Sequence, residues 1–179
     1  MSTLTTNLHE VSGDILLSRA QAVAHGVSPN DPFHSGLALL LREKWPAMYK
    51  DFRHYCQTSH PKPGTIWEWA GASDHGPVRI VALLTQEGGF EHGSRPGPAS
   101  LSAINHALKD LRLFVERENI RSLALPRLCS GVGGMDFDHV LPLIRQHLGN
   151  LGIPVYLYST YHKGLQAAES APALAAAQR

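Results

Sequence analysis

The sequence predicts a single α/β domain of three layers, in which a mixed, mainly parallel sheet lies between two layers of helices. Residues 101–159 read as helix, strand, glycine-rich loop, helix and strand. This alternation is typical of parallel sheets, because each strand returns to the same edge through a helix. The chain has 179 residues, of which 43% are hydrophobic, and this suits one domain with a filled core.

The elements follow from the spacing of apolar side chains. The predicted strands are short apolar or alternating runs near glycine or proline: residues 8–17, interrupted at Gly13, and 22–27, 65–70, 78–85, 122–125 and 155–159. The predicted helices have apolar side chains three and four residues apart: residues 36–56, divided at Pro46, 101–118, with Ser100 as N-cap, and 138–148. Proline removes a helical donor, and this is why Pro46 is expected to end one helix and begin another.

Charge and composition exclude several classes of protein. The chain has sixteen basic and fifteen acidic side chains, so a strongly basic surface for nucleic acid is not expected. A local basic patch is still compatible with this balance. The two cysteines, Cys56 and Cys129, fit neither a metal site nor a disulfide framework. No apolar stretch predicts a membrane span or a signal peptide. We therefore expect a cytoplasmic protein with no metal, no cofactor and no membrane partner.

The segment 126–134 is the strongest candidate for a binding site. It follows a short buried strand, contains three glycines and precedes a helix. Glycine lets the backbone approach phosphate oxygens closely, and the following helix adds the positive end of its dipole. The alternative is a tight strand-to-helix turn, since a Walker lysine is missing. The residues predicted to hold the diphosphate of a nucleotide are Ser130, Gly131, Val132, Gly133 and Gly134.

Three other segments carry polar groups after predicted strands, where ligands of open α/β sheets gather. Gly36 begins a helix and allows close approach, and Ser28 precedes it in a polar loop. Asp14 can accept from an exocyclic amine such as that of adenine, although an N-cap is the commoner role. Residues 86–98 form a long loop with four glycines and two prolines, which favours a lid or wall over a plain connector.

Taken together, these segments resemble the macrodomain, an ADP-ribose-binding family, over residues 11–160. Within that family the chain is similar to the branch of terminal ADP-ribose protein glycohydrolase and of the antitoxin macrodomains that reverse DNA ADP-ribosylation. Three stretches carry the resemblance: residues 11–16, residues 24–28 followed by 35–38, and residues 125–134. Their order and spacing are specific to the family. The macrodomain is expected to span residues 1–166. Residues 167–179 form an alanine-rich tail, which would be either a short surface helix or a flexible end.

The resemblance implies a role for individual residues. Asp14 would bind the adenine amine, and the Ile15 N–H would donate to a nitrogen of the adenine ring. Ser28 and Gly36 would line the distal ribose and the diphosphate, and residues 130–133 would wrap the phosphates. Tyr158 would border the adenine, or would equally belong to the core.

The catalytic pattern departs from the family at two positions. The branch uses a lysine after the strand that corresponds to residues 81–85, and Gln86 stands there; the partner aspartate falls at about Gly133. Glutamine cannot form a Schiff base, so a covalent lysine mechanism is excluded at Gln86. The candidate catalytic residues are therefore Gln86, to orient a water or the distal ribose, and Glu87 and His92, to transfer a proton, with Glu91 in reserve.

Two functions follow from the resemblance. The first is a hydrolase that removes mono-ADP-ribose from modified acidic side chains of proteins, with ADP-ribosylated nucleic acid as a less favoured substrate. The second is a reader that binds ADP-ribose or a free metabolite without chemistry. The missing lysine favours the reader, whereas the resemblance to the hydrolase branch favours the enzyme.

Overall fold

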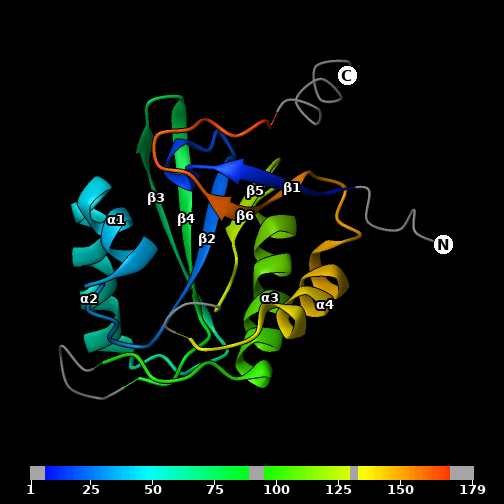
Figure 1. The fold of residues 1–179 in the computed structure, drawn as a ribbon. Helices are drawn as coiled ribbons and strands as arrows, with labels where there is room; N and C mark the ends of the chain where they lie inside the picture. Colours follow the sequence, from blue (N-terminus) through cyan, green and yellow to red (C-terminus); the bar gives the residue numbers. More distant parts are fainter. Residues whose placement is uncertain (1–6, 89–94, 130–132, 170–179) are drawn as a thin grey trace.

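The computed structural model describes residues 7–88, 95–129 and 133–169. Its centre is one six-stranded sheet with the order β1-β6-β5-β2-β4-β3 (Figure 1). The strands are β1 (Leu8–Gly13), β2 (Ala22–Val27), β3 (Ile66–Ser73), β4 (Gly76–Leu84), β5 (Leu123–Pro126) and β6 (Val155–Tyr161). All neighbours pair in parallel except β3 and β4, which form an antiparallel hairpin. The predicted mixed, mainly parallel sheet is confirmed.

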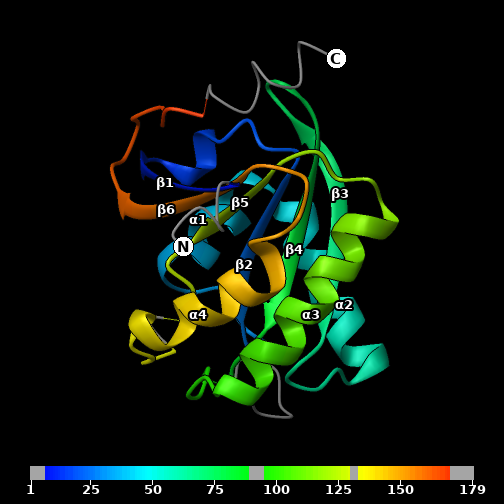
Figure 2. The same cartoon turned by 90° about the vertical axis from the view of Figure 1, so that its right-hand side faces the viewer.

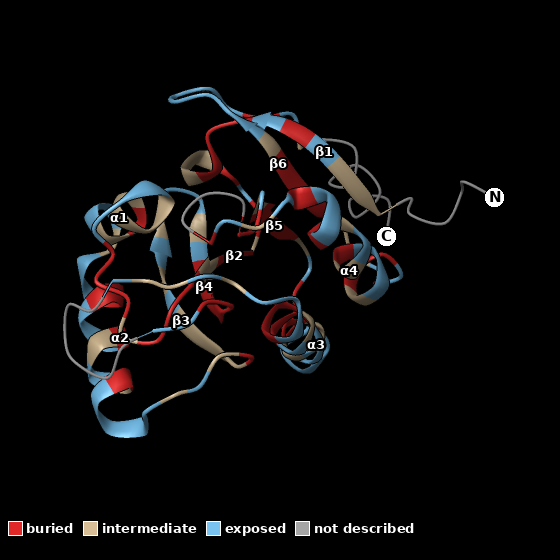
Figure 3. Cartoon of the chain, turned by 60° about the horizontal axis from the view of Figure 1, so that its bottom comes forward, coloured by how far each residue is buried: buried red, intermediate tan, exposed pale blue. Residues whose placement is uncertain are grey.

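Helices cover both faces of the sheet, as Figures 1 and 2 show. The helices are α1 (Gly36–Lys44), α2 (Pro46–Ser59), α3 (Leu101–Arg117) and α4 (Phe137–Leu148), with a short 3₁₀ helix, η2 (Ile15–Leu17). One buried cluster joins α3 and α4 to the sheet, and a second cluster joins α1 and α2 to its other face. Figure 3 shows how the buried residues concentrate in the strands and on the inner sides of the helices.

The helix boundaries follow local chemistry. The Ser100 hydroxyl accepts from the Ala103 N–H at 3.0 Å and so caps α3, as predicted. Pro46 occupies the first position of α2, where its missing N–H has no helical partner to lose, and it separates α2 from α1. The Asp136 carboxylate caps α4. None of the helices within the described residues is long and apolar enough to cross a membrane.

The parallel strands place four connections at one edge of the sheet. At this edge β1 leads into η2, and β2 leads into the 28–35 loop. Next to them, β4 leads into the segment that begins at Thr85, and β5 leads into the glycine-rich loop. These are the four segments in which the sequence predicts ligand contacts. The topology therefore brings them to the same side of the molecule.

The chain after β6 packs back onto the domain. Ala167 is buried, and the Glu169 carboxylate accepts from the Ser18 hydroxyl at 2.8 Å and from the Arg19 N–H at 3.0 Å. The Tyr158 hydroxyl also donates to this carboxylate. The predicted boundary at 166 therefore falls inside a packed segment, because contacts of the domain continue at least to Glu169.

Candidate functional site

A pocket of about 260 Å³ lies at the carboxyl edge of the sheet. It is formed by the end of β2, the start of α1, the segment after β4 and the loop after β5. Three predicted site residues, Gly36, Gln86 and Gly133, lie together in its wall. The other lining residues are His25, Gly26, Asp31, Ser35, Leu37, Ala38, Pro96, Pro126, Arg127, Leu128 and Cys129.

The first turn of α1 supplies backbone donors to this pocket. Gly36 has φ +60°, which L side chains rarely adopt, and a Cβ there would meet no atom within 4 Å. Gly36, Leu37 and Ala38 line the pocket, and the first N–H groups of a helix lack intrahelical partners. This end of the pocket therefore suits an anion, because free N–H groups and the helix dipole act together.

The described residues of the glycine-rich loop form another part of the pocket wall. The Cys129 carbonyl accepts from the Met135 N–H at 2.8 Å, and a Cβ on Gly133 would lie 2.9 Å from the same oxygen. Only glycine fits at position 133 without displacing the backbone. Gly134 has φ +68° and is exposed. The predicted phosphate-binding residues 130–132 lie outside the described residues, so their role stays a prediction.

Gln86, the first of the predicted catalytic residues, is buried in the pocket wall. Its amide Nε2 donates to the Gly97 carbonyl at 3.1 Å, and its backbone pairs with Ala99. Glu87 is exposed and does not line the pocket. Both Glu91 and His92 lie outside the described residues. Of the predicted catalytic candidates, the structure thus brings Gln86 to the pocket and leaves Glu87 outside it.

His25 is a pocket residue that the sequence reasoning did not single out. Its side chain is 2% exposed and contacts Phe33 edge-on, with ring centroids 5.7 Å apart. Burial lowers the pKa of His25 to about 4, and Nε2 has no hydrogen-bond partner within the described part of the chain. The imidazole is therefore neutral at neutral pH. The sequence signal that could have identified His25 is its place as a histidine inside an otherwise apolar strand.

Ser28 does not line the pocket. It is fully buried, and its hydroxyl and N–H both contact the Asp31 carboxylate, at 3.2 and 3.1 Å. Asp31 also accepts from the Phe33 N–H at 2.9 Å and lines the pocket. In this structure Ser28 acts by fixing Asp31 and the 28–33 turn, and its contact with a ribose stays a prediction.

The residues predicted to bind adenine lie outside the lining of this pocket. Asp14 caps η2: one carboxylate oxygen accepts from the Leu16 N–H at 3.0 Å and the other from the Gly164 N–H at 2.9 Å. Ile15 is buried, and Tyr158 belongs to the core beneath α1 and α2. The N-cap alternative for Asp14 and the core alternative for Tyr158 are thus confirmed, while their adenine contacts stay predictions.

A search of solved structures identifies the fold. The macrodomain of Thermus aquaticus DarG superposes with a TM-score of 0.72 at 24% identity, covering 85% of this chain and 97% of that one. Thermosipho africanus DarTG in complex with ADP-ribose gives 0.75 at 25% identity, covering 91% of this chain and 43% of that one. The chain has the macrodomain fold. The pocket of this macrodomain lies at the carboxyl edge of the sheet, beside a helix N-terminus, where ligands of open α/β sheets commonly bind.

Curated proteins with similar sequences are named as enzymes. A DNA ADP-ribosyl transferase–DNA ADP-ribosyl glycohydrolase fusion protein of Thermosipho africanus is 28% identical, with 94% of this chain and 46% of the relative matched. A DNA ADP-ribosyl glycohydrolase of Thermus aquaticus is 26% identical, with 84% and 41% matched. The chain therefore spans less than half the length of these relatives. No model of a protein family matches it.

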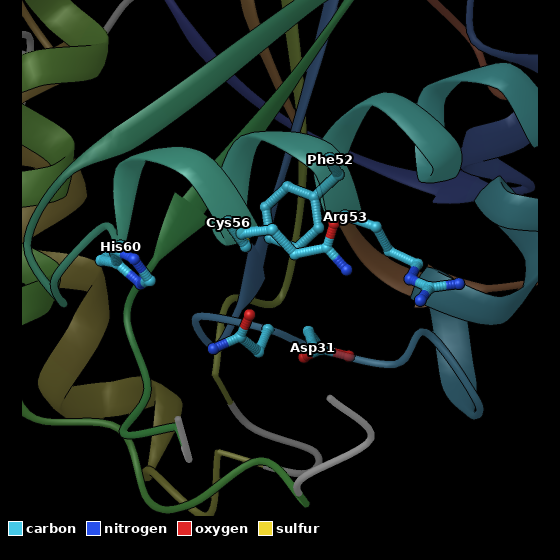
Figure 4. A pocket seen from close by; sticks show the side chains of 7 residues that line it. Asp31, Phe52, Arg53, Cys56 and His60 are labelled. Atoms are coloured by element: carbon cyan, nitrogen blue, oxygen red, sulfur yellow. The ribbon is translucent and has the colours of Figure 1, made fainter. Parts of the chain in front are cut away.

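A second, smaller pocket of about 160 Å³ lies beside the first. Figure 4 shows Phe52, Arg53 and Cys56 of α2 on one side of it and Asp31 on the other. Asn30, Gln57 and His60 complete its lining. Because Asp31 lines both pockets, the macrodomain has two hollows that meet at the 30–31 turn. Within the described residues, no group of three His, Cys, Asp or Glu is placed to hold a metal ion.

Proposed function

We propose that this macrodomain binds ADP-ribose in the pocket between Gly36 and Gly133 and releases it from a modified macromolecule. The observation that carries the proposal is the pocket itself. The start of α1 and the described residues of the glycine-rich loop both line it, and both kinds of element suit an anion. A similar solved structure, Thermosipho africanus DarTG, is in complex with ADP-ribose.

The diphosphate would lie between the first turn of α1 and the loop after β5. Arg127 also lines the pocket, and its side chain would bring a positive charge to the same site as the phosphates. Its guanidinium lies 4.8 Å from the centroid of the Phe137 ring. The adenine would extend toward Asp14 and Tyr158, and the distal ribose would lie at Gln86. Bound anions at helix N-termini typically gain about 0.3–1 kcal/mol from the dipole alone.

The chemistry would be hydrolysis at the anomeric carbon of the distal ribose. Water forms the new bond to that carbon, the bond to the modified group breaks, and the proton of the water passes to the leaving group. Gln86 supplies no nucleophile, because its amide is neutral and is held by Gly97. Its part would be to hold the ribose or the water in place, so that catalysis comes from geometry and electrostatics.

The modified group is either a protein carboxylate or a nucleotide. An ester on an acidic side chain is labile, so its hydrolysis needs little catalytic assistance from a site without lysine. This favours the substrate predicted from the sequence, a protein modified on a carboxylate. The names of the relatives favour ADP-ribosylated DNA. A reader without activity is the second candidate, and the residues at positions 86 and 133 favour it, since neither can serve as lysine or aspartate.

The experiment that tests the proposal measures release of ADP-ribose from two substrates by the purified chain. One is a protein modified on glutamate or aspartate, and the other is an oligonucleotide with one ADP-ribosylated base. Release from either supports the hydrolase and identifies its substrate. Binding of free ADP-ribose without release from both would establish the reader instead.

A further inference from the structure

His25 differs from the other buried side chains with polar atoms in the first pocket, in which we place ADP-ribose. Asp31 accepts hydrogen bonds within its own turn at 2.9, 3.1 and 3.2 Å, and Gln86 donates to a carbonyl at 3.1 Å. The Cys129 thiol donates to a hydroxyl at 3.2 Å. His25 lines the same pocket, yet its Nε2 atom is buried and has no partner within the described residues. The described chain thus leaves a hydrogen-bonding group unused at the pocket.

This unpaired nitrogen is unusual among the buried side chains. In the parts of the chain that the structure describes, the other buried side-chain atoms without a partner are the Nε atoms of Arg53 and Arg79. A guanidinium has several further N–H groups, and those of Arg79 bond Glu68 and Glu118. A neutral imidazole has a single donor and a single acceptor, so an unpaired Nε2 leaves half of its bonding capacity unused. A buried polar group without a partner is costly, and a ligand that supplies the partner removes that cost.

The His25 ring is neutral and held in place. Burial lowers the pKa of His25 to about 4, so at neutral pH the ring carries one N–H. Its edge-on contact with Phe33, with ring centroids 5.7 Å apart, fixes the ring beside the pocket. Either ring nitrogen can carry the proton, and a bound acceptor selects the nitrogen that faces it. The ring can therefore serve as a preorganised donor to a ligand oxygen.

The place of His25 in the sheet brings the ring to the diphosphate. Its strand, β2, lies between β5, which leads into the glycine-rich loop, and β4, which leads to Gln86 (Figure 1). Ala24 belongs to the buried cluster under α3 and α4, whereas Phe33, the ring that His25 contacts, belongs to the cluster under α1 and α2. The His25 ring thus lies on the side of the sheet from which the first turn of α1 reaches the pocket.

We propose that His25 donates a hydrogen bond from its neutral imidazole to a diphosphate oxygen of bound ADP-ribose. The proposal rests on the proposed function, because that function places the diphosphate beside the first turn of α1. Phosphate oxygens accept hydrogen bonds, and a bond to an anionic oxygen is about twice as strong as one between neutral groups. The ring would add a side-chain donor to the backbone N–H groups of α1 and so help to fix the diphosphate.

The test titrates the full chain with ADP-ribose and, in parallel, with ADP, which has the diphosphate but no distal ribose. The variant His25→Phe keeps a flat ring against Phe33 and removes both ring nitrogens. The variant His25→Gln restores a side-chain N–H donor. The matched control is His139→Phe, at an exposed histidine of α4. Urea unfolding of each variant verifies that it is folded.

We expect His25→Phe to bind ADP-ribose and ADP about tenfold or more weakly than the wild type. The affinities of His25→Gln should stay within about threefold of the wild type, because its amide can donate to the same oxygen. In the wild type, the side-chain nitrogen resonances of His25 should shift when ADP is added, and those of His139 should not. The resonances of His25 are assigned by their loss from the spectrum of His25→Phe.

Three results would overturn the inference. The first is wild-type affinity of His25→Phe for both ligands. The second is a loss confined to ADP-ribose, which would place the ring at the distal ribose. The third, which holds even if His25→Phe does not fold, is an absence of any change in the histidine nitrogen resonances of the wild type at saturating ADP. Failure of the wild type to bind ADP-ribose would instead overturn the proposed function.

Discussion

At the scale of single residues, His25 is a buried titratable side chain whose environment differs between the folded and the unfolded chain. Burial lowers its pKa from 6.5 to about 4. Between these two pH values the unfolded chain takes up a proton that the folded chain does not. The contribution of neutral His25 to the free energy of unfolding is therefore fully present above about pH 6.5 and is lost as the pH decreases toward 4.

We predict that this titration costs about 2 kcal/mol of unfolding free energy between about pH 7 and about pH 5. The His25→Asn variant should lose this part of the pH dependence, because asparagine does not titrate there. Denaturant unfolding at both pH values measures it, with His139→Asn, an exposed histidine of α4, as control. An unchanged pH dependence in His25→Asn would show that other groups are responsible.

Gln86 gives the second prediction at this scale. The Gln86→Ala variant removes the amide held by Gly97 while leaving the phosphate-binding backbone in place. Release of ADP-ribose should slow by about 100-fold, since loss of positioning affects the reacting bond most, while affinity for free ADP-ribose falls by less than about threefold. Single-turnover release and calorimetry measure the two effects. Undiminished release would remove Gln86 from the mechanism.

Residue chemistry was only partly predictable from the sequence. Periodicity predicted the helix at residues 101–118, and three of its evenly spaced apolar side chains, Ile104, Leu108 and Leu111, are buried in α3. It could not reveal that Ser28 points at Asp31 or that His25 lines a pocket, because such contacts depend on how the 28–33 turn folds. The orientation of a polar side chain next to a strand is a tertiary property that sequence spacing does not encode.

At the scale of elements, the glycine-rich loop leaves no room for a side chain at Gly133. A Cβ on Gly133 would lie 2.9 Å from the Cys129 carbonyl oxygen and 3.0 Å from the Cys129 Cα, both backbone atoms. The loop must therefore shift if any side chain is added there. The sequence predicted the loop from its three glycines and its place between a strand and a helix, and the structure adds the reason that position 133 excludes side chains.

We predict that Gly133→Ala weakens binding of ADP-ribose by about tenfold or more and lowers stability by about 1–3 kcal/mol. The matched control is Gly152→Ala, since a Cβ on Gly152 would meet no atom within 4 Å. Calorimetry and urea unfolding of both variants provide the measurements. Full affinity in Gly133→Ala would mean that the phosphates lie elsewhere.

At the scale of the whole molecule, the sheet and its last segment hold the site together. The alternation of strands and helices predicted the sheet, whereas the return of the chain over β1 and β6 was not foreseen, because an alanine-rich end has no periodic signal. Glu169 fixes that return through Ser18, Arg19 and Tyr158. The Gly164 N–H of the same segment donates to Asp14, at the end predicted to bind adenine.

We predict that Glu169→Ala destabilises the protein by about 1–3 kcal/mol, because the Tyr158 hydroxyl and the Ser18 hydroxyl lose a charged acceptor. Amide exchange should accelerate in residues 162–168 and stay unchanged in α3. Hydrogen exchange with mass spectrometry distinguishes this local release from global unfolding. Protection of 162–168 equal to that of the wild type would contradict the anchoring role.

The pocket between α1 and the glycine-rich loop is the feature on which the functional account depends. Calorimetric titration of the purified chain with ADP-ribose tests it most directly. The account predicts saturable binding of one ADP-ribose per chain, with a dissociation constant in about the micromolar range. Absence of heat at about millimolar ADP-ribose would contradict it.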